Sequence, residues 1–205
     1  MSKRAEDVKK AAEEAQNDSG KIETHVKGLK SESRKERQDS SAVIAEIARR
    51  NPEMIVSFGP DLVEALELPE AQTRWESLDA LTEICPYDTR VCDKAIKGAE
   101  VALFDETSGP LRLAAMRFLC TLGATTENRS EKVWDLIDEG IQCYHGDLEF
   151  NEMLVALVGF SSGKLSPRVS KEFAARMKFD STNGKGPLKK RATQIQENLK
   201  KKKQA

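Results

Sequence analysis

Acidic side chains recur on one face of a helix predicted in the first half of the chain. Glu76, Asp79 and Glu83 are spaced at i, i+3 and i+7, which places all three on one helical face. Glu152 is a further acidic residue on a later predicted helix. Carboxylates in such an arrangement attract a basic peptide or a basic protein surface. The alternative is an ordinary solvated face, because single charged stripes are common on helices.

Basic side chains form two runs near the C-terminal end. The residues that could contact phosphate groups are Lys189, Lys190, Arg191, Lys200 and Lys201. Lys and Arg neutralise phosphates without reading a base sequence, so such binding depends strongly on salt. No aromatic residue follows Phe179, and the runs therefore lack a platform for stacking bases. The alternatives are a solvated end or a tail attracted to the acidic part of the same chain.

The charge of the chain is unevenly distributed although its formal net charge is only −1. Residues 40–163 contain 22 acidic and 10 basic side chains, whereas residues 164–205 contain 13 basic and 3 acidic ones. An acidic body followed by a basic end is informative about binding partners rather than about the fold.

The residue patterns that usually carry catalysis do not occur in the sequence. There is no Gly-rich phosphate-binding loop and no G-x-S-x-G motif. The four cysteines include no C-x-x-C pair, and the two histidines are not paired at metal-ligand spacing. We therefore expect no enzymatic activity, no metal site and no cofactor, and we interpret the cysteines as small buried groups.

A repeat at intervals of 37 and 38 residues predicts the elements that position these side chains. The segments 37–47, 74–84 and 112–122 each begin with Arg and carry apolar residues seven and ten positions later. A period in this range is typical of stacked helical hairpins, since one hairpin cannot bury its apolar face alone. The sequence therefore predicts an all-α fold.

The segment from residue 94 to residue 123 resembles a HEAT repeat, a unit of the armadillo-like α-solenoids. The matching positions are Asp105, Pro110, Arg112, Ala114, Ala115, Leu119 and Leu122. The resemblance implies that the second helices line a concave face. It also implies that Arg37, Arg74 and Arg112 pair with Glu67 and Asp105 to orient the turns. A weaker echo of the turn at Asp105 occurs around Asp180, and Phe150 stands where a further Arg would be expected.

We expect three parts in the chain. Residues 1–36 contain few large apolar side chains and are predicted to be a flexible charged arm with transient helix. Residues 37–199 are predicted to form a short α-solenoid of about four HEAT-like hairpins, in which 186–199 is a degenerate capping helix. Residues 200–205 are interpreted as a basic tail.

The function expected from these features is that of a non-catalytic interaction module or scaffold. Its acidic concave surface would bind a protein or a basic peptide, and the alternative is a nucleic-acid-associated accessory protein that uses the basic C-terminal helix. No apolar run reaches membrane-spanning length and the first residues lack the apolar core of a signal peptide, so we expect a cytoplasmic protein without a membrane partner. The oligomeric state stays open.

Overall fold

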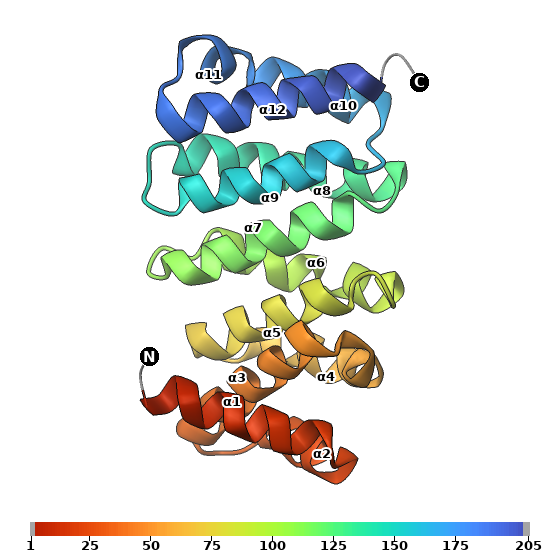
Figure 1. Ribbon diagram of the computed structural model, residues 1–205, viewed down its shortest axis with the longest axis vertical. Helices are drawn as coiled ribbons and strands as arrows, with labels where there is room; N and C mark the ends of the chain where they lie inside the picture. The colour runs from red at the N-terminus through yellow and green to blue at the C-terminus, as the bar shows by residue number, and fades with distance from the viewer. Residues whose placement is uncertain (1–2, 203–205) are drawn as a thin grey trace. The chain divides into compact units, whose positions relative to one another are not determined.

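The computed structural model describes residues 3–202, and every regular element in this range is a helix (Figure 1). The chain divides into two compact units, Met1–Ala114 and Ala115–Ala205, with the boundary inside helix α7 (Gly109–Gly123). The prediction of an all-α fold is confirmed for the described residues.

The first unit contains the helices α1 to α6 and the beginning of α7. Their bounds are α1 (Lys3–Gln16), α2 (Ser19–Gly28), α3 (Arg34–Arg50), α4 (Gly59–Glu64), α5 (Ala71–Ile84) and α6 (Thr89–Leu103). Short 3-10 turns occupy η1 (Pro52–Met54), η2 (Val56–Phe58) and η3 (Ala65–Glu67). Asp88 caps α6, because its carboxylate accepts hydrogen bonds from the backbone N–H groups of Arg90 and Val91.

Helix α3 lies against α5 and supplies much of the core of the first unit. Ile44 and Ile47 of α3 and Leu81 and Ile84 of α5 are fully buried. These are the positions seven and ten residues after each Arg, so the repeat in the sequence correctly identifies the buried face. Small polar side chains are buried on the same two helices, among them Ser41 of α3 and Ser77 of α5.

Residues 3–16 and 19–28 form the helices α1 and α2, and both contact α3 (Figure 1). The side chains that this segment and the following Leu29 bury are mostly small or branched: Ala12, Ala15, Ile22, Val26 and Leu29. The prediction of a flexible arm was based on the scarcity of large apolar side chains in this segment. Alanines bury little area each, yet they allow close approach of neighbouring helices. The mobility of this segment and the boundaries at residues 36, 186 and 199 stay predictions.

Ion pairs at the turns connect successive repeats of the first unit. The Arg37 guanidinium pairs with Glu70, whose side chain is only 5% exposed, and Arg74 pairs with Asp105 at 2.9 Å. The pairing of Asp105 is as predicted. The prediction of Glu67 as the other acidic partner is wrong, because Glu67 is exposed at the end of a 3-10 turn and Glu70 lies at the start of α5.

The second unit contains the rest of α7 and the helices α8 to α12. Their bounds are α8 (Glu127–Tyr144), α9 (Phe150–Ser162), α10 (Pro167–Arg176), α11 (Lys178–Asn183) and α12 (Gly186–Lys202). Three aromatic rings, Trp134, Phe160 and Phe173, pack with centroids 5.3 to 6.3 Å apart and fill its core. The segment around Asp180, aligned in sequence with the turn at Asp105, forms the short helix α11 instead.

Helix α12 is attached to the second unit by a thin apolar stripe. Ala192, Ile195 and Leu199 are buried, and α12 contacts α9 and α11. Leu188, at the start of the same helix, is only partly buried. That α12 caps the repeats stays a prediction.

Candidate functional site

The acidic residues predicted on α5 meet charged residues of α3 along the contact between the two helices. We define the acidic cluster as Glu46 of α3 with Glu76, Asp79 and Glu83 of α5. Arg49 of α3 lies among them: its guanidinium donates to Glu46 at 2.7 Å and to Glu76 at 3.3 Å. The same guanidinium lies 3.9 Å from the Asp79 carboxylate. The acidic cluster therefore surrounds a cation that belongs to the protein itself.

Burial raises the pKa of Glu76, whose side chain is only 14% exposed, although nearby Arg49 opposes the rise. The negative charge of Asp79 raises this pKa further, and a hydrogen bond with Trp75 lowers it. The pKa of Glu83 is also raised, first by desolvation and then by Asp79. Desolvation therefore outweighs the stabilising effect of Arg49 on the charged forms of both glutamates.

The N-terminal side of the acidic cluster borders a pocket of about 310 Å³ between α1, α3 and α5. Its lining residues are Arg4, Ala5, Val8, Lys9, Ala42, Glu46, Arg49, Gln72 and Glu76. Arg4 already donates to Asp39 at 2.9 Å and to Gln72 at 3.3 Å. Helix α1 therefore brings positive charge to this side, whereas exposed Glu83 lies toward the other end of α5.

Sequence reasoning missed two members of this site, Glu46 and Arg49. Their spacing of three residues, and that of Glu46 and Arg50 at four, could have revealed the ion pairs within α3. No pattern in the sequence shows that Arg49 also reaches across to α5. That interaction depends on how α3 and α5 are rotated against each other.

Glu152 lies on α9 in the second unit, whereas the other three predicted acidic residues lie in the first unit. Its side chain is 55% exposed and lies 3.6 Å from the Arg117 guanidinium. A concave surface that combines Glu152 with the α5 residues stays a prediction.

The predicted phosphate-contacting residues lie on α12 and are not equivalent. Lys190, Lys200 and Lys201 are exposed. Lys189 is exposed as well but donates to the backbone carbonyl of Thr182 at 2.9 Å. Arg191 donates to the backbone carbonyl of Asn151 and is partly buried, so this residue helps to attach α12 to α9. Phosphate contact by any of these residues stays a prediction.

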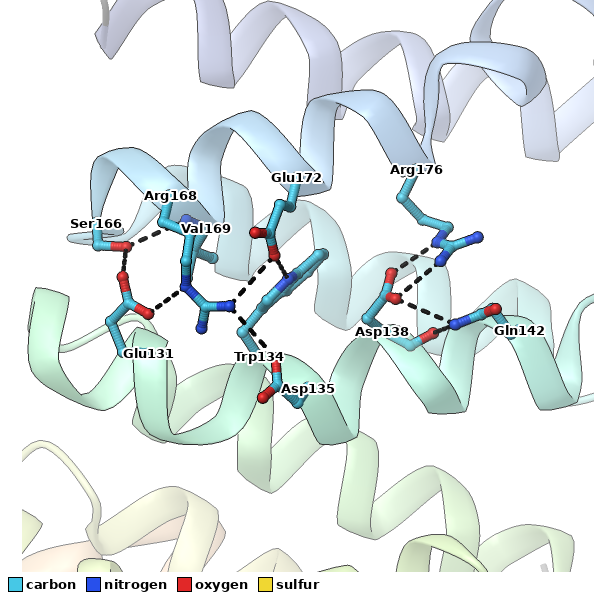
Figure 2. A network of polar contacts seen from close by, with 10 residues as sticks. All are labelled: Glu131, Trp134, Asp135, Asp138, Gln142, Ser166, Arg168, Val169, Glu172 and Arg176. Carbon is cyan, nitrogen blue, oxygen red and sulfur yellow. Dashed lines mark hydrogen bonds and ion pairs between the residues drawn. The ribbon is translucent and has the colours of Figure 1, made fainter.

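The acidic residues of α8 are engaged with α10, as Figure 2 shows. Arg176 binds Asp138 through two bonds of 2.6 and 2.8 Å, and Arg168 binds Glu131 at 2.5 Å. The indole N–H of Trp134 donates to Glu172 at 2.6 Å. This face therefore holds two helices of the second unit together through ion pairs.

Metal and thiol chemistry find little support in residues 3–202. Within this range no three His, Cys, Asp or Glu side chains are grouped so that they could hold a metal ion. Cys85, Cys92 and Cys120 are buried as expected, but Cys143 is exposed. Burial raises the pKa of the Cys120 thiol, and a hydrogen bond with Cys85 together with burial raises the pKa of Cys92. Such thiols are poor nucleophiles at neutral pH.

Comparison with known proteins gives a fold but no relative. No protein-family model and no curated protein matches the chain. A designed armadillo repeat protein, solved in complex with the peptide (KR)4, is similar with a TM-score of 0.76, 16% identity and coverage of 95% of this chain and 90% of that one. The chain has an armadillo-like helical repeat fold.

Two further solved structures agree with the armadillo-like fold. An engineered protein, structural genomics target OR329, has a TM-score of 0.74 and 20% identity, with 95% of this chain and 88% of that chain covered. The structure of computationally designed armadillo repeat proteins for modular peptide recognition has a TM-score of 0.72 and 15% identity, with 94% of this chain and 90% of that chain covered. The resemblance inferred from the Arg-led repeat is thus confirmed at the level of the fold. None of the described helices is long and apolar enough to span a membrane.

Proposed function

We propose that the protein is a non-catalytic binding module whose acidic cluster captures an Arg- or Lys-rich segment of another protein. The observation that carries this proposal is the position of Arg49, whose guanidinium approaches three carboxylates from two helices. The cluster already accommodates one guanidinium, and its geometry suits others of the same kind. The designed armadillo repeat protein in complex with (KR)4 supports a basic peptide as the class of ligand.

The charges available at the cluster favour a second cation. Arg49 is shared among Glu46, Glu76 and Asp79, and Arg50 is divided between Glu46 and Glu13. A basic side chain from a ligand would lie near Glu83, the exposed carboxylate at one end of the cluster. The attraction would steer association and weaken with salt, since exposed charges are screened within about 10 Å at 0.1 M ionic strength.

Binding should also depend on pH in a direction fixed by the raised pKa values. Glu76 and Glu83 take up protons at a higher pH than ordinary glutamates do, because both are desolvated. The protonated carboxyl groups no longer attract a cation. Affinity is therefore expected to fall as the pH decreases through the raised pKa values, and binding in that range should release protons.

The test measures the affinity of a fluorescein-labelled (Lys-Arg)4 peptide by anisotropy. The double variant Glu76→Gln/Asp79→Asn removes two charges but keeps the side-chain shapes, and we expect an affinity roughly tenfold lower, equivalent to ~1.4 kcal/mol. The control variant Glu100→Gln/Glu106→Gln removes two exposed charges from the α6–α7 region and should bind nearly as the parent does. Equal affinity of parent and Glu76→Gln/Asp79→Asn would refute the proposal.

Nucleic-acid binding by α12 remains the second candidate, because Lys190, Lys200 and Lys201 are exposed on this helix. Deleting α12 is unsuitable as a test, since the deletion would uncover the core that Ile195 and Leu199 help to close. Substituting the three lysines with Gln should instead reduce the salt dependence of duplex DNA binding by roughly 0.9 for each phosphate that is no longer neutralised. An unchanged salt slope would eliminate this candidate.

A further inference from the structure

One end of the second unit is formed by the α8–α9 connection, α11 and the first turns of α12, which lie near one another in Figure 1. His145 of the connection contacts the Asp180 carboxylate of α11, with Nε2 3.2 Å from both oxygens. Lys189 of α12 donates to the Thr182 carbonyl of α11, and Arg191 donates to the Asn151 carbonyl of α9. These interactions bring the three segments together.

Two large apolar side chains protrude from this end without packing in the unit. Leu148, three residues after His145, is 94% exposed, and Phe179, directly before Asp180, is 70% exposed. Nearby Phe150 is buried, and its ring centroid lies 5.0 Å from that of the His145 ring. The connection and α11 are therefore anchored by Phe150, His145 and Asp180, and neither Leu148 nor Phe179 contributes much to holding them.

Exposed lysines lie on both sides of Phe179 along the sequence. Lys178 precedes Phe179, and Lys185, Lys189 and Lys190 occupy the connection to α12 and its first turns. The acidic residues beside Leu148 are Asp147 and Glu149. Asp180, the acidic residue of α11, is buried against His145. Basic residues thus outnumber exposed acidic ones at this end.

We propose that this end is a docking surface for an anionic lipid membrane. We call it the α11 tip and define it by Leu148, Phe179, Lys178, Lys185, Lys189 and Lys190. Phe and Leu side chains enter the boundary between headgroups and acyl chains, while lysines beside them contact anionic headgroups. Such binding takes place on the membrane surface and needs no membrane-spanning helix.

The protrusion of the two side chains favours a lipid surface over a protein or a nucleic acid. A side chain that is almost fully exposed can enter a fluid interface without a matching cavity, whereas a protein partner would need a pocket for each. Phosphate groups occur in lipids and in nucleic acids alike, so the lysines alone do not discriminate. Leu148 and Phe179 favour a lipid over a nucleic acid, because a phosphate backbone offers no apolar phase that these side chains could enter.

The experiment measures cosedimentation of the full chain with vesicles of phosphatidylcholine, with or without phosphatidylserine. We expect the parent to bind the anionic vesicles and not the neutral ones. Leu148→Ser/Phe179→Ser should weaken binding by about tenfold or more, and Lys185→Gln/Lys190→Gln by about fivefold for each lysine. All four positions are exposed, so the variants should keep the helical content of the parent in circular dichroism.

Matched controls come from exposed positions of α6 in the first unit. Val101 is 58% exposed, and Lys94 and Lys97 are exposed as well. Val101→Ser and Lys94→Gln/Lys97→Gln should bind the anionic vesicles as the parent does. An additional Phe179→Trp variant should show a blue shift of the added tryptophan emission on binding, which reports entry into an apolar phase.

Several results would overturn the proposal. They are a parent chain that does not bind anionic vesicles, equal binding by Leu148→Ser/Phe179→Ser, and no blue shift from Phe179→Trp. If duplex DNA or an acidic protein bound through the lysines while vesicle binding ignored the apolar substitutions, the α11 tip would be assigned to that partner and the lipid proposal would be wrong.

Discussion

Leu29→Ala tests whether the N-terminal helices are a packed part of the first unit. Leu29 directly follows α2 as its C-cap, is only 2% exposed, and borders a pocket of about 270 Å³ together with Ala65 and Leu68. The substitution removes the equivalent of about three methylene groups, which corresponds to ~2.4 kcal/mol of lost transfer free energy at ~0.8 kcal/mol each. The cavity that remains raises the expected loss of unfolding free energy to about 2–5 kcal/mol.

The assay is equilibrium unfolding in urea, followed by circular dichroism. With a dependence on urea of about 2 kcal/mol per M, a loss of this size lowers the midpoint by about 1–2.5 M. Lys27→Ala, an exposed position on the same helix, serves as the control and should change the unfolding free energy by less than ~0.5 kcal/mol.

The two interpretations of residues 3–28 give different results in this assay. If Leu29→Ala costs no more than Lys27→Ala, and the amides of α2 exchange with solvent as rapidly as those of an unfolded peptide, then the segment is the flexible arm that the sequence suggested. The packing described for α1 and α2 would then be refuted.

Two further predictions concern backbone packing and the acidic cluster. A Cβ at Gly163 would lie 2.4–2.5 Å from Ala124 atoms, including the backbone, so Gly163→Ala should cost about 1–3 kcal/mol in urea unfolding. Gly159→Ala, within α9 and facing open space, should instead stabilise by about 0.5–1 kcal/mol; similar values for both would contradict the close approach. The folded-state pKa of Glu76 is raised, so the native state binds more protons than the unfolded state at pH values between the ordinary and the raised pKa. The stability of the native state therefore falls as the pH rises through that window. Glu76→Gln should therefore be more stable than the parent at neutral pH and nearly equal to it below the ordinary pKa of glutamate; a variant that is less stable at neutral pH would show that the Arg49 ion pair outweighs the burial.

The regular part of the fold follows from the sequence because stacking repeats an identical physical requirement. Ile44, Ile47, Leu81 and Ile84 recur at fixed distances from an Arg, and each must be buried by the neighbouring repeat. The acidic face of α5 can also be predicted from the sequence, since spacing along one helix determines which side chains share a face.

The interactions between elements could not be predicted in this way. The Arg37 partner is Glu70 rather than Glu67 because the chain leaves its 3-10 turn in an extended conformation before α5 begins. Arg49 reaches Glu76 only through the rotation of α3 against α5. The exposure of Phe179 could not be predicted either, since an aromatic residue beside a repeat turn is usually expected in the core.

The most direct test of the proposed function is a titration of the isotopically labelled protein with unlabelled (Lys-Arg)4 peptide, followed by amide chemical shifts. The proposal predicts the largest shifts around Arg49 on α3 and around Glu76, Asp79 and Glu83 on α5, and these shifts should decrease when salt is raised. Shifts confined to other helices, or their absence at a peptide concentration that saturates binding in the anisotropy assay, would contradict it.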